Sequence, residues 1–274
     1  MKLRTFVLIG LSIVLLGSLI LYDASTNALK RLSIKTITLK SDEINDNFNG
    51  FTLVYFSDTH LYNQDENYFK TIIQTIQSVG ADVILFGGDL IDQDYYHSLS
   101  SKQRSSMIEQ LTSLSAPYGK YAVLGDDDQV NQADISNILY TSDFEVITNQ
   151  VIQIHQLGPD YINLIGAPNQ ISDYDQNITE SLHHFDYSIL LAYDPAYLDA
   201  TNANIDLILS GKTHGGQINL PIIGSVYDKN STYLKEHYKK HFTELYVSNG
   251  VGVDGLKMRL FKNPDILLIR LLKN

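Results

Sequence analysis

The chain contains no cysteine and no block of basic residues. The first absence excludes disulfide bonds, thiolate metal ligands and cysteine nucleophiles, so any bound metal must be held by histidine, carboxylate or amide groups. The second absence, together with a net charge of -11, disfavours nucleic acid as a partner and gives no general attraction to anionic lipid. No repeat of fixed period and no low-complexity segment is present. Because of its net charge and its lack of a basic block, we expect the chain to have no nucleic-acid partner.

The length and composition are those of one folded domain. With 274 residues and 44% hydrophobic content, the chain is long enough to bury a substantial core. We expect an anchor at residues 1–22, a polar tether at 23–45 that leads into a first edge strand, and a single domain at 46–274.

The N-terminus has the composition of a membrane-spanning helix. Lys2 and Arg4 precede an uncharged, apolar run at residues 5–22. About 18 helical residues at roughly 1.5 Å each reach about 27 Å, which just spans a bilayer core. Because the basic residues precede the run, we expect a single-pass anchor in the cell membrane, with a cytoplasmic N-terminus and the domain outside. A cleaved secretory signal is the alternative, although residues 24–26 form a poor cleavage site.

Short apolar strands alternate with helical patterns in the rest of the chain. The continuous apolar runs at 53–56 and 83–86 are typical of strands buried on both faces, and apolar residues at 69–76 recur at helical spacing. A second helix is expected at 101–114. Further strands are expected at 121–124, 144–147, 161–165, 188–191 and 207–209. The pattern predicts an α/β fold.

Five of these strands end in polar, mostly glycine-rich turns. Polar groups at successive strand ends of an α/β sheet converge on one crevice, where such folds bind ligands. The turns lie at residues 57–60, 87–89, 125–128, 192–195 and 210–216.

Two aspartates and two histidines in these turns form a candidate set of metal ligands. Asp58 and His60 are two residues apart, so both point to one side of an extended chain. Asp89 follows paired glycines that allow the backbone to approach an ion closely, although it would equally serve as the N-cap of a following helix. His214 has the alternative role of a turn histidine. Taken together, the two Asp and two His residues form an oxygen/nitrogen donor set suited to Mn, Fe or Zn.

Five motifs follow one another along the chain, namely Ser57-Asp58-Thr59-His60, Gly88-Asp89-Leu90-Ile91-Asp92, Gly125-Asp126-Asp127-Asp128, Leu191-Ala192-Tyr193-Asp194-Pro195 and Gly211-Lys212-Thr213-His214-Gly215-Gly216-Gln217. Their order resembles that of the calcineurin-like metallophosphoesterases, most closely their membrane-anchored bacterial phosphodiesterase branch. The resemblance covers about residues 50–272, including a closing segment with Arg259 that is similar to that branch. It implies an α/β two-sheet sandwich flanked by helices, preceded here by one N-terminal transmembrane helix, and two metals bridged by one Asp.

The resemblance implies a complete first metal site and an altered second one. The ligands of the first metal would be Asp58, His60, the bridging Asp89 and His214. At the second site the sequence departs from the family pattern. Asp126, a fifth candidate ligand, stands at an Asn position, Tyr193 and Lys212 stand at His positions, and Asp127 stands where the family has the His that protonates the leaving group or stabilises the transition state.

These departures have a physical interpretation. A protonated lysine has three donors and no lone pair, so Lys212 is expected to replace a cation rather than to hold one. Lys212 would pair with Asp126 as a buried, compensated ion pair, and the chain would bind one divalent ion. Unrelated drift after loss of activity is the alternative.

Two functions follow from different classes. The first is a metal-dependent hydrolase of phosphodiesters or phosphomonoesters, with Lys212 as a second positive charge and Asp127 as a candidate general acid. The second is a catalytically inactive pseudoenzyme that binds a ligand or a partner. The other histidines are expected at the surface, namely His97, His155, His183, His184, His237 and His241.

Overall fold

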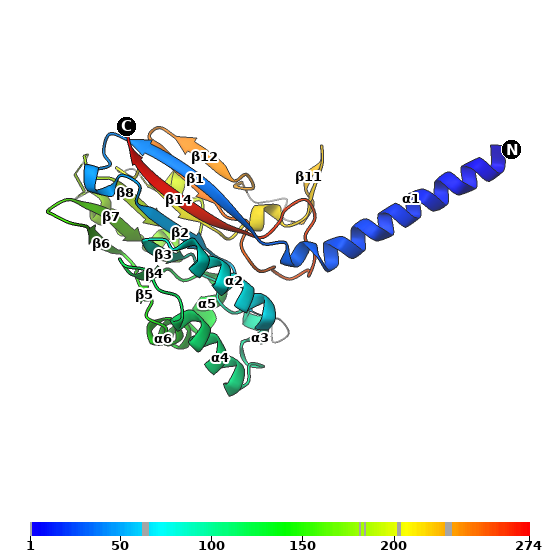
Figure 1. Cartoon of the computed structure of the whole chain (residues 1–274), viewed down its shortest axis with the longest axis horizontal. Coiled ribbons are helices and arrows are strands. Elements are labelled where there is room, and N and C mark those ends of the chain that lie inside the picture. The colour runs from blue at the N-terminus through cyan, green and yellow to red at the C-terminus, as the bar shows by residue number, and fades with distance from the viewer. Residues whose placement is uncertain (1, 62–65, 181, 184, 202–203, 228–231) are drawn as a thin grey trace.

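A computed structural model describes the chain except for residues 1, 62–65, 181, 184, 202–203 and 228–231. Two six-stranded sheets face each other, helices cover their outer sides, and one long helix projects from one end (Figure 1). The predicted two-sheet α/β sandwich, preceded by an N-terminal apolar helix, is confirmed.

The first sheet has the strand order β1-β14-β2-β3-β4-β5. Its two longest strands, β1 and β14, are parallel neighbours, whereas β14 is antiparallel to β2. β2, β3, β4 and β5 are parallel to one another. The bounds are β1 (Ser33–Ser41), β2 (Thr52–Phe56), β3 (Val83–Phe86), β4 (Lys120–Ala122), β5 (Glu145–Val146) and β14 (Asp265–Lys273).

The second sheet has the order β12-β13-β9-β8-β7-β6, and a separate two-stranded hairpin joins β10 to β11. β13, β9, β8 and β7 are parallel, with antiparallel β12 and β6 at the edges. The bounds are β6 (Gln150–His155), β7 (Tyr161–Gly166), β8 (Ser188–Leu191), β9 (Leu207–Ser210), β10 (Asn219–Leu220), β11 (Gly224–Ser225), β12 (His237–Lys240) and β13 (Thr243–Val247).

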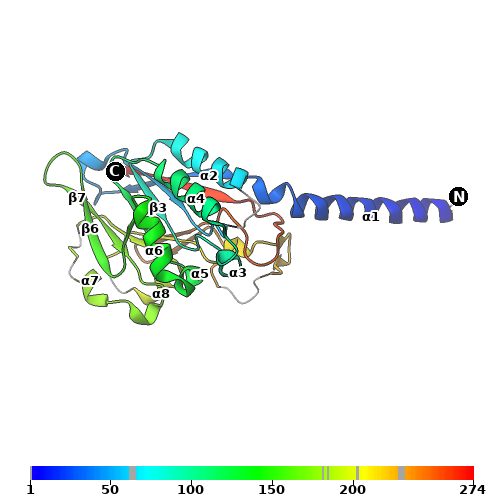
Figure 2. The same cartoon turned by 90° about the horizontal axis from the view of Figure 1, so that it is seen from below.

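The helices after the first are short to medium in length, and α2, α4 and α6 cover the outer face of the first sheet (Figure 2). They are α2 (Glu66–Val79), α3 (Gln93–Tyr96), α4 (Ser101–Thr112), α5 (Asp126–Val130), α6 (Gln132–Thr141), α7 (Gln176–Glu180) and α8 (Tyr197–Ala200), with 3-10 turns at 28–30, 46–48, 171–173 and 214–216.

Alternation along the central strands explains why their sequences are apolar throughout. In β2, Leu53 and Tyr55 point into the core between the two sheets. Val54 and Phe56 point to the other side, where they pack beneath the helices. Because both faces of the strand are covered, the positions from Leu53 to Phe56 are all buried, and the removal of these side chains from water stabilises the sandwich.

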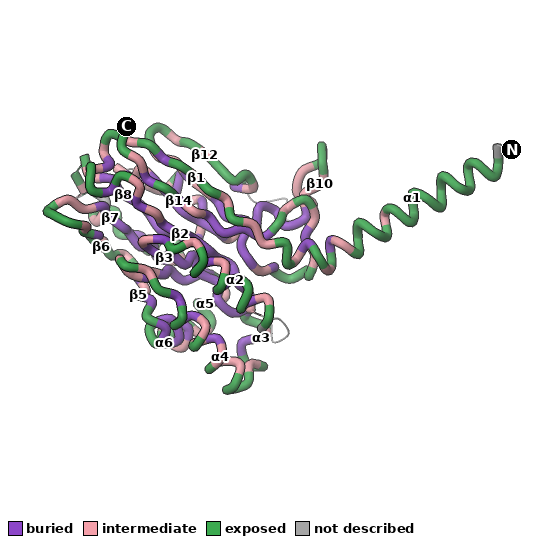
Figure 3. The backbone as a smooth tube through the Cα atoms, in the orientation of Figure 1, coloured by how far each residue is buried: buried purple, intermediate pink, exposed green. Residues whose placement is uncertain are grey.

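The N-terminal helix α1 (Lys2–Ser25) is exposed along most of its length (Figure 3). By length and composition it qualifies as a membrane-spanning helix. Its C-terminal end, in contrast, packs on the domain, since Ala24 is buried, as is Ala28 in the 3-10 turn that follows. β1 begins only a few residues later, so the segment expected as a tether is largely packed along the first sheet.

Strand direction determines which end of the sandwich carries the polar turns. β1 starts beside α1, and β14 runs parallel to it. β2 is antiparallel to β14, and β3 and β4 follow the direction of β2. The carboxyl ends of β2, β3 and β4 therefore point toward the end of the domain from which α1 leaves.

Candidate metal centre

The turns after β2 and β3 are held together by backbone hydrogen bonds. The N–H of Asp58 donates to the carbonyl of Gly88 (2.9 Å), and the N–H of His60 donates to the carbonyl of Asp89 (3.1 Å). Gly88 has a φ of 98° and a Cβ there would lie 2.5 Å from the backbone nitrogen of Gly125. Only glycine fits this approach, which brings the turn after β4 beside the turn after β3.

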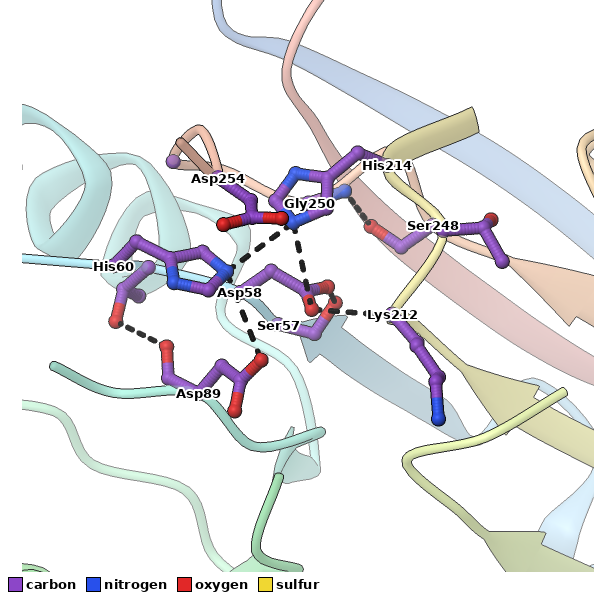
Figure 4. A network of polar contacts seen from close by, with 12 residues as sticks. Ser57, Asp58, His60, Asp89, Lys212, His214, Ser248, Gly250 and Asp254 are labelled. Carbon is purple, nitrogen blue, oxygen red and sulfur yellow. Dashed lines mark hydrogen bonds and ion pairs between the residues drawn. The ribbon is translucent and has the colours of Figure 1, made fainter. Parts of the chain in front are cut away.

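Four side chains from three strand ends converge (Figure 4). The Nε2 atoms of His60 and His214 are 3.2 Å apart. Nε2 of His60 lies 3.7 Å from Oδ2 of Asp89, and Nε2 of His214 lies 3.9 Å from Oδ1 of Asp58. All four residues are buried. The structure thus brings together Asp58, His60, Asp89 and His214.

Burial and charge perturb the titration of this cluster. Burial raises the pKa of Asp58, and raises that of Asp89 well above its ordinary range. Burial alone would lower the pKa of His60, but the hydrogen bond to Asp127 and the charges of Asp89 and Asp58 raise it to about 9. Burial, with the nearby charges of His60 and Arg259, holds the pKa of His214 well below its usual value. One positive charge among these carboxylates is therefore favoured.

Each imidazole also has a partner at its other nitrogen. Nδ1 of His60 lies 3.2 Å from Oδ2 of Asp127, which also accepts from the N–H of Gln93 (3.3 Å). Nδ1 of His214 lies 3.3 Å from Nη2 of the fully buried Arg259. Such partners fix the ring orientation, so that both Nε2 atoms face the same space.

The neighbouring half of the site contains a phenol and an ammonium group. The hydroxyl of Tyr193 donates to Oδ2 of Asp89 (2.6 Å), and burial raises the pKa of this tyrosine so that the phenol keeps its proton. Nζ of Lys212 donates to Oδ2 of Asp194 (2.7 Å) and lies 3.3 Å from Oδ2 of Asp126. In Figure 4 the lysine side chain points away from the two imidazoles.

The ion pair at Lys212 differs from the expected one in two respects. The side chains of Lys212 and Asp126 are 34% and 47% exposed, so their pair is not buried. Asp194, 22% exposed, is the closer carboxylate. The hydrogen bond to Asp194 and the charges of both carboxylates raise the pKa of the lysine although burial opposes this, and the lysine stays charged.

The backbone of the site is unusual as well. A non-glycine residue with φ between about +20° and +160° is uncommon, and such strain collects at functional sites. Five residues of this site have a φ in this range, namely Asp58 (54°), His60 (39°), Asp89 (56°), Lys212 (67°) and His214 (50°).

Sequence reasoning missed three supporting residues. Asp194 is one residue of a motif, and nothing in the sequence identifies it as the partner of Lys212. Asp128 accepts from the N–H groups of Asp89 (2.7 Å), Leu90 (3.0 Å) and Gly125 (2.9 Å), which fixes two turns with one carboxylate. Arg259 belongs to the closing segment of the resemblance, but no pattern in the sequence indicates that it contacts His214. The one sequence signal for any of the three was the run of three acidic residues after Gly125, which includes Asp128.

Other expectations concern residues outside the cluster. Asp92, not Asp89, is the N-cap of the helix that follows, and accepts from the N–H of Asp94 (2.9 Å). Asp126 lies at the rim and accepts from Asn169 (3.0 Å). His184 lies outside the described residues. The remaining five histidines expected at the surface are exposed, namely His97, His155, His183, His237 and His241.

Comparison with known proteins agrees with this fold. A family model described as calcineurin-like phosphoesterase matches residues 51–216. The uncharacterized metallophosphoesterase YkuE of Bacillus subtilis (strain 168) is 32% identical over 248 residues, covering 85% of this chain and 83% of that protein. The metallophosphoesterase YkoQ of the same strain is 27% identical over 267 residues, covering 90% and 92%. The chain belongs to the calcineurin-like phosphoesterase family, as its motif order predicted.

A further relative is a transmembrane protein by name. The "transmembrane protein with metallophosphoesterase domain" of Bos taurus is 27% identical over 265 residues, which cover 88% of this chain and 57% of that protein. Its name describes an arrangement like the one expected here, a membrane segment joined to a metallophosphoesterase domain.

The family uses divalent metals, and the two halves of the site fit such an ion differently. Ligand atoms of Asp58, His60 and His214 all lie within 4.8 Å of one another, and the donor types suit a divalent ion. In the other half, the ammonium group of Lys212 has no lone pair to offer, and the Tyr193 hydroxyl donates to the oxygen of Asp89 that faces it. The first half fits a metal ion and the second does not.

Proposed function

We propose that this protein is a membrane-tethered phosphoester hydrolase that depends on one divalent ion per chain. The observation that supports it is the convergence of four buried donors from three strand ends beside the charged Lys212. The intact donor set favours hydrolysis over a purely binding function, because drift after loss of activity would act equally on both halves of the site.

The ion would be held by Asp58, His60, Asp89 and His214, with the exposed Asp126 as a weaker fifth candidate. Bound there, Mn, Fe or Zn would supply Lewis-acid polarisation of a phosphoryl oxygen. Phosphodiesters and phosphomonoesters are both candidate substrates.

The protein's own groups would orient the ester and stabilise its charge. Lys212 is held by Asp194 and lies 5.2 Å above the ring of Tyr193, so its ammonium group is a fixed positive charge for a phosphoryl oxygen. Tyr193 holds the carboxylate of Asp89 in place. Asp127 orients His60 through Nδ1, and it is also the candidate proton donor for the leaving group.

The deciding experiment measures bound metal in the purified chain together with hydrolysis of a generic chromogenic phosphodiester and monoester. One ion per chain with metal-dependent hydrolysis supports the proposal. Two ions per chain would show that Lys212 does not replace a cation. Bound metal without hydrolysis of either ester would favour the pseudoenzyme.

We also propose that α1 remains attached and anchors the chain in the cell membrane, with the domain outside. The burial of Ala24 supports retention, because cleavage near it would remove a packed residue. Protease added to intact cells should digest the domain. Digestion that occurs only after lysis would contradict this orientation.

A further inference from the structure

Exposed apolar side chains lie on a short hairpin close to the candidate metal centre. Ile222 and Ile223, at the turn between β10 and β11, are 107% and 72% exposed. Phe261 is exposed on a neighbouring loop. The N–H of Asn219 donates to the carbonyl of Leu260 (2.9 Å), which ties the hairpin to that loop. We refer to Ile222, Ile223 and Phe261 as the apolar rim.

The apolar rim continues directly from the site. The turn that contains His214 ends at Gln217, and β10 begins two residues later. The carbonyl of Gln217 accepts from the N–H of Leu260 (3.1 Å). The side-chain amide of Gln217 also donates to the carbonyls of Asp254 (3.0 Å) and Leu256 (2.8 Å). The position of the apolar rim is therefore fixed relative to the metal centre.

The α1 helix leaves the domain at the same end. Asp23 is the first charged residue after the apolar run, so the bilayer boundary lies near it. The next residue, Ala24, is buried on the domain, and its carbonyl accepts from the N–H of Arg259 (2.9 Å). No free linker separates the helix from the domain. Both Figure 1 and Figure 2 show α1 leaving from the end opposite the β6–β7 turn.

We propose that the apolar rim inserts into the surface of the lipid bilayer beside α1 and turns the candidate metal centre toward the membrane. This inference rests on the proposed anchoring by α1. The transfer of isoleucine and phenylalanine side chains from water to the interface lowers the free energy. Because α1 already holds the domain at the bilayer, this contact is effectively intramolecular and needs little affinity of its own. A partner protein is not required to cover the rim.

The opposite end of the domain provides matched positions. Leu157 is 88% exposed and Phe242 is 90% exposed, so both are large apolar side chains that, like Ile222, are almost wholly exposed. Leu157 precedes β7 and Phe242 precedes β13, whereas the site turn follows the parallel strand β9. Both therefore lie at the end away from α1. Exposure alone cannot distinguish these positions from the rim, but contact with lipid can.

The absence of cysteine allows each position to be probed separately in the full-length chain. The variants Ile222→Cys, Leu157→Cys and Phe242→Cys would each carry one polarity-sensitive fluorophore. They would be reconstituted in phosphatidylcholine vesicles that contain spin-labelled lipid as a quencher. We expect several-fold stronger quenching and a blue-shifted emission at position 222 relative to 157 and 242. Equal quenching at the three positions would overturn the proposal.

The same experiment distinguishes two further outcomes. A blue shift at position 222 that grows with protein density but ignores the lipid quencher would indicate contact between copies of the chain, and would also overturn the proposal. Failure of the chain to float with the vesicles would refute anchoring by α1, and with it this inference. Because fluorescence does not depend on catalysis, an absence of phosphoester hydrolysis would refute only the proposed activity.

A paired variant tests whether the hairpin and the neighbouring loop insert together. Ile222→Ser with Ile223→Ser removes apolar side chains that contact water, so the thermal unfolding of the domain should not change. Label at a Phe261→Cys position should then lose several-fold of its quenching, because the rim as a whole leaves the interface. Unchanged quenching in this background would overturn a shared insertion of the hairpin and the loop.

Discussion

The two halves of the site share Asp89 and the turn after β9, but they differ in burial and charge. Asp58, His60 and His214 are buried, and their ligand atoms lie within 4.8 Å of one another. Lys212 and Asp126, on the other side of Asp89, are half-exposed and joined by an ion pair. The proposal of one ion per chain rests on this difference, because one half offers converging metal ligands and the other half offers a side-chain cation.

The largest effect is expected when a metal ligand is removed from the first half of the site. His214→Ala should abolish stable metal binding, because a ligand is lost from a set of four. The loss of affinity should exceed the roughly 10–100-fold that a lost outer partner causes. Metal content of the purified chain, measured by elemental analysis, checks this.

The matched control is His155→Ala, which removes an exposed histidine on the β6 edge strand. Its metal content should equal that of the wild type. Equal metal in wild type and the His214 variant would show that the cluster is not the metal site.

The second test rebuilds the altered half. The variant with Asp126→Asn, Asp127→His, Tyr193→His and Lys212→His restores the family pattern. Bound metal should rise from about one toward about two ions per chain, because the lone pairs of two imidazoles replace an ammonium and a phenol donor. Phosphodiester hydrolysis should appear or increase, up to the roughly 100- to 10,000-fold typical of a restored general acid.

Lys212→His alone is the control for that variant. It removes the ammonium group while Tyr193 still donates to Asp89. It should therefore gain less metal than the fourfold variant. An equal gain would mean that the tyrosine does not hinder a second ion.

The sequence alone predicted the strand ends, the four converging metal-ligand candidates and the family. Each of these predictions rests on a local pattern or on the order of the motifs. The partners of those candidates were not predicted. Asp194 is next to Tyr193 in sequence, but only the fold directs it to Lys212. The exposure of the Lys212 pair was also misjudged, since charge complementarity in a sequence carries no information on solvent access.

The third test uses pH on the metal-free chain. The pKa of His60 is raised from 6.5 to about 9 in the folded state. Its protonated form therefore contributes stability that is complete below the unfolded pKa and is lost as pH rises through about 9. The raised pKa values of Asp58 and Asp89 act in the same direction, because their ionisation destabilises the folded state.

Urea unfolding in the presence of a chelator should accordingly show lower stability at about pH 9 than at about pH 6. His60→Gln should flatten this dependence. Added metal should reverse it, since ligation requires the neutral imidazole and competes with the proton. A flat profile for the metal-free wild type would contradict the charge balance described for this half of the site.

The smallest expected effect concerns the ion pairs of Lys212. A fully buried pair would lose roughly 3–5 kcal/mol when one partner is removed. The pairs here are partly solvated, so screening reduces each to about 1 kcal/mol or less. The shorter contact, 2.7 Å to the less exposed Asp194, should exceed the 3.3 Å contact to Asp126.

Double-mutant cycles of Lys212→Met with Asp194→Asn, and of Lys212→Met with Asp126→Asn, measure the two couplings by urea unfolding. The first should be near 1 kcal/mol and the second about half of that, while the exposed Lys240–Asp199 pair should be near zero. If both Lys212 cycles were additive within about 0.3–0.5 kcal/mol, the lysine would not be bound by its carboxylates. Its ammonium group would then be free to move, and could not act as the fixed positive charge in place of a second ion.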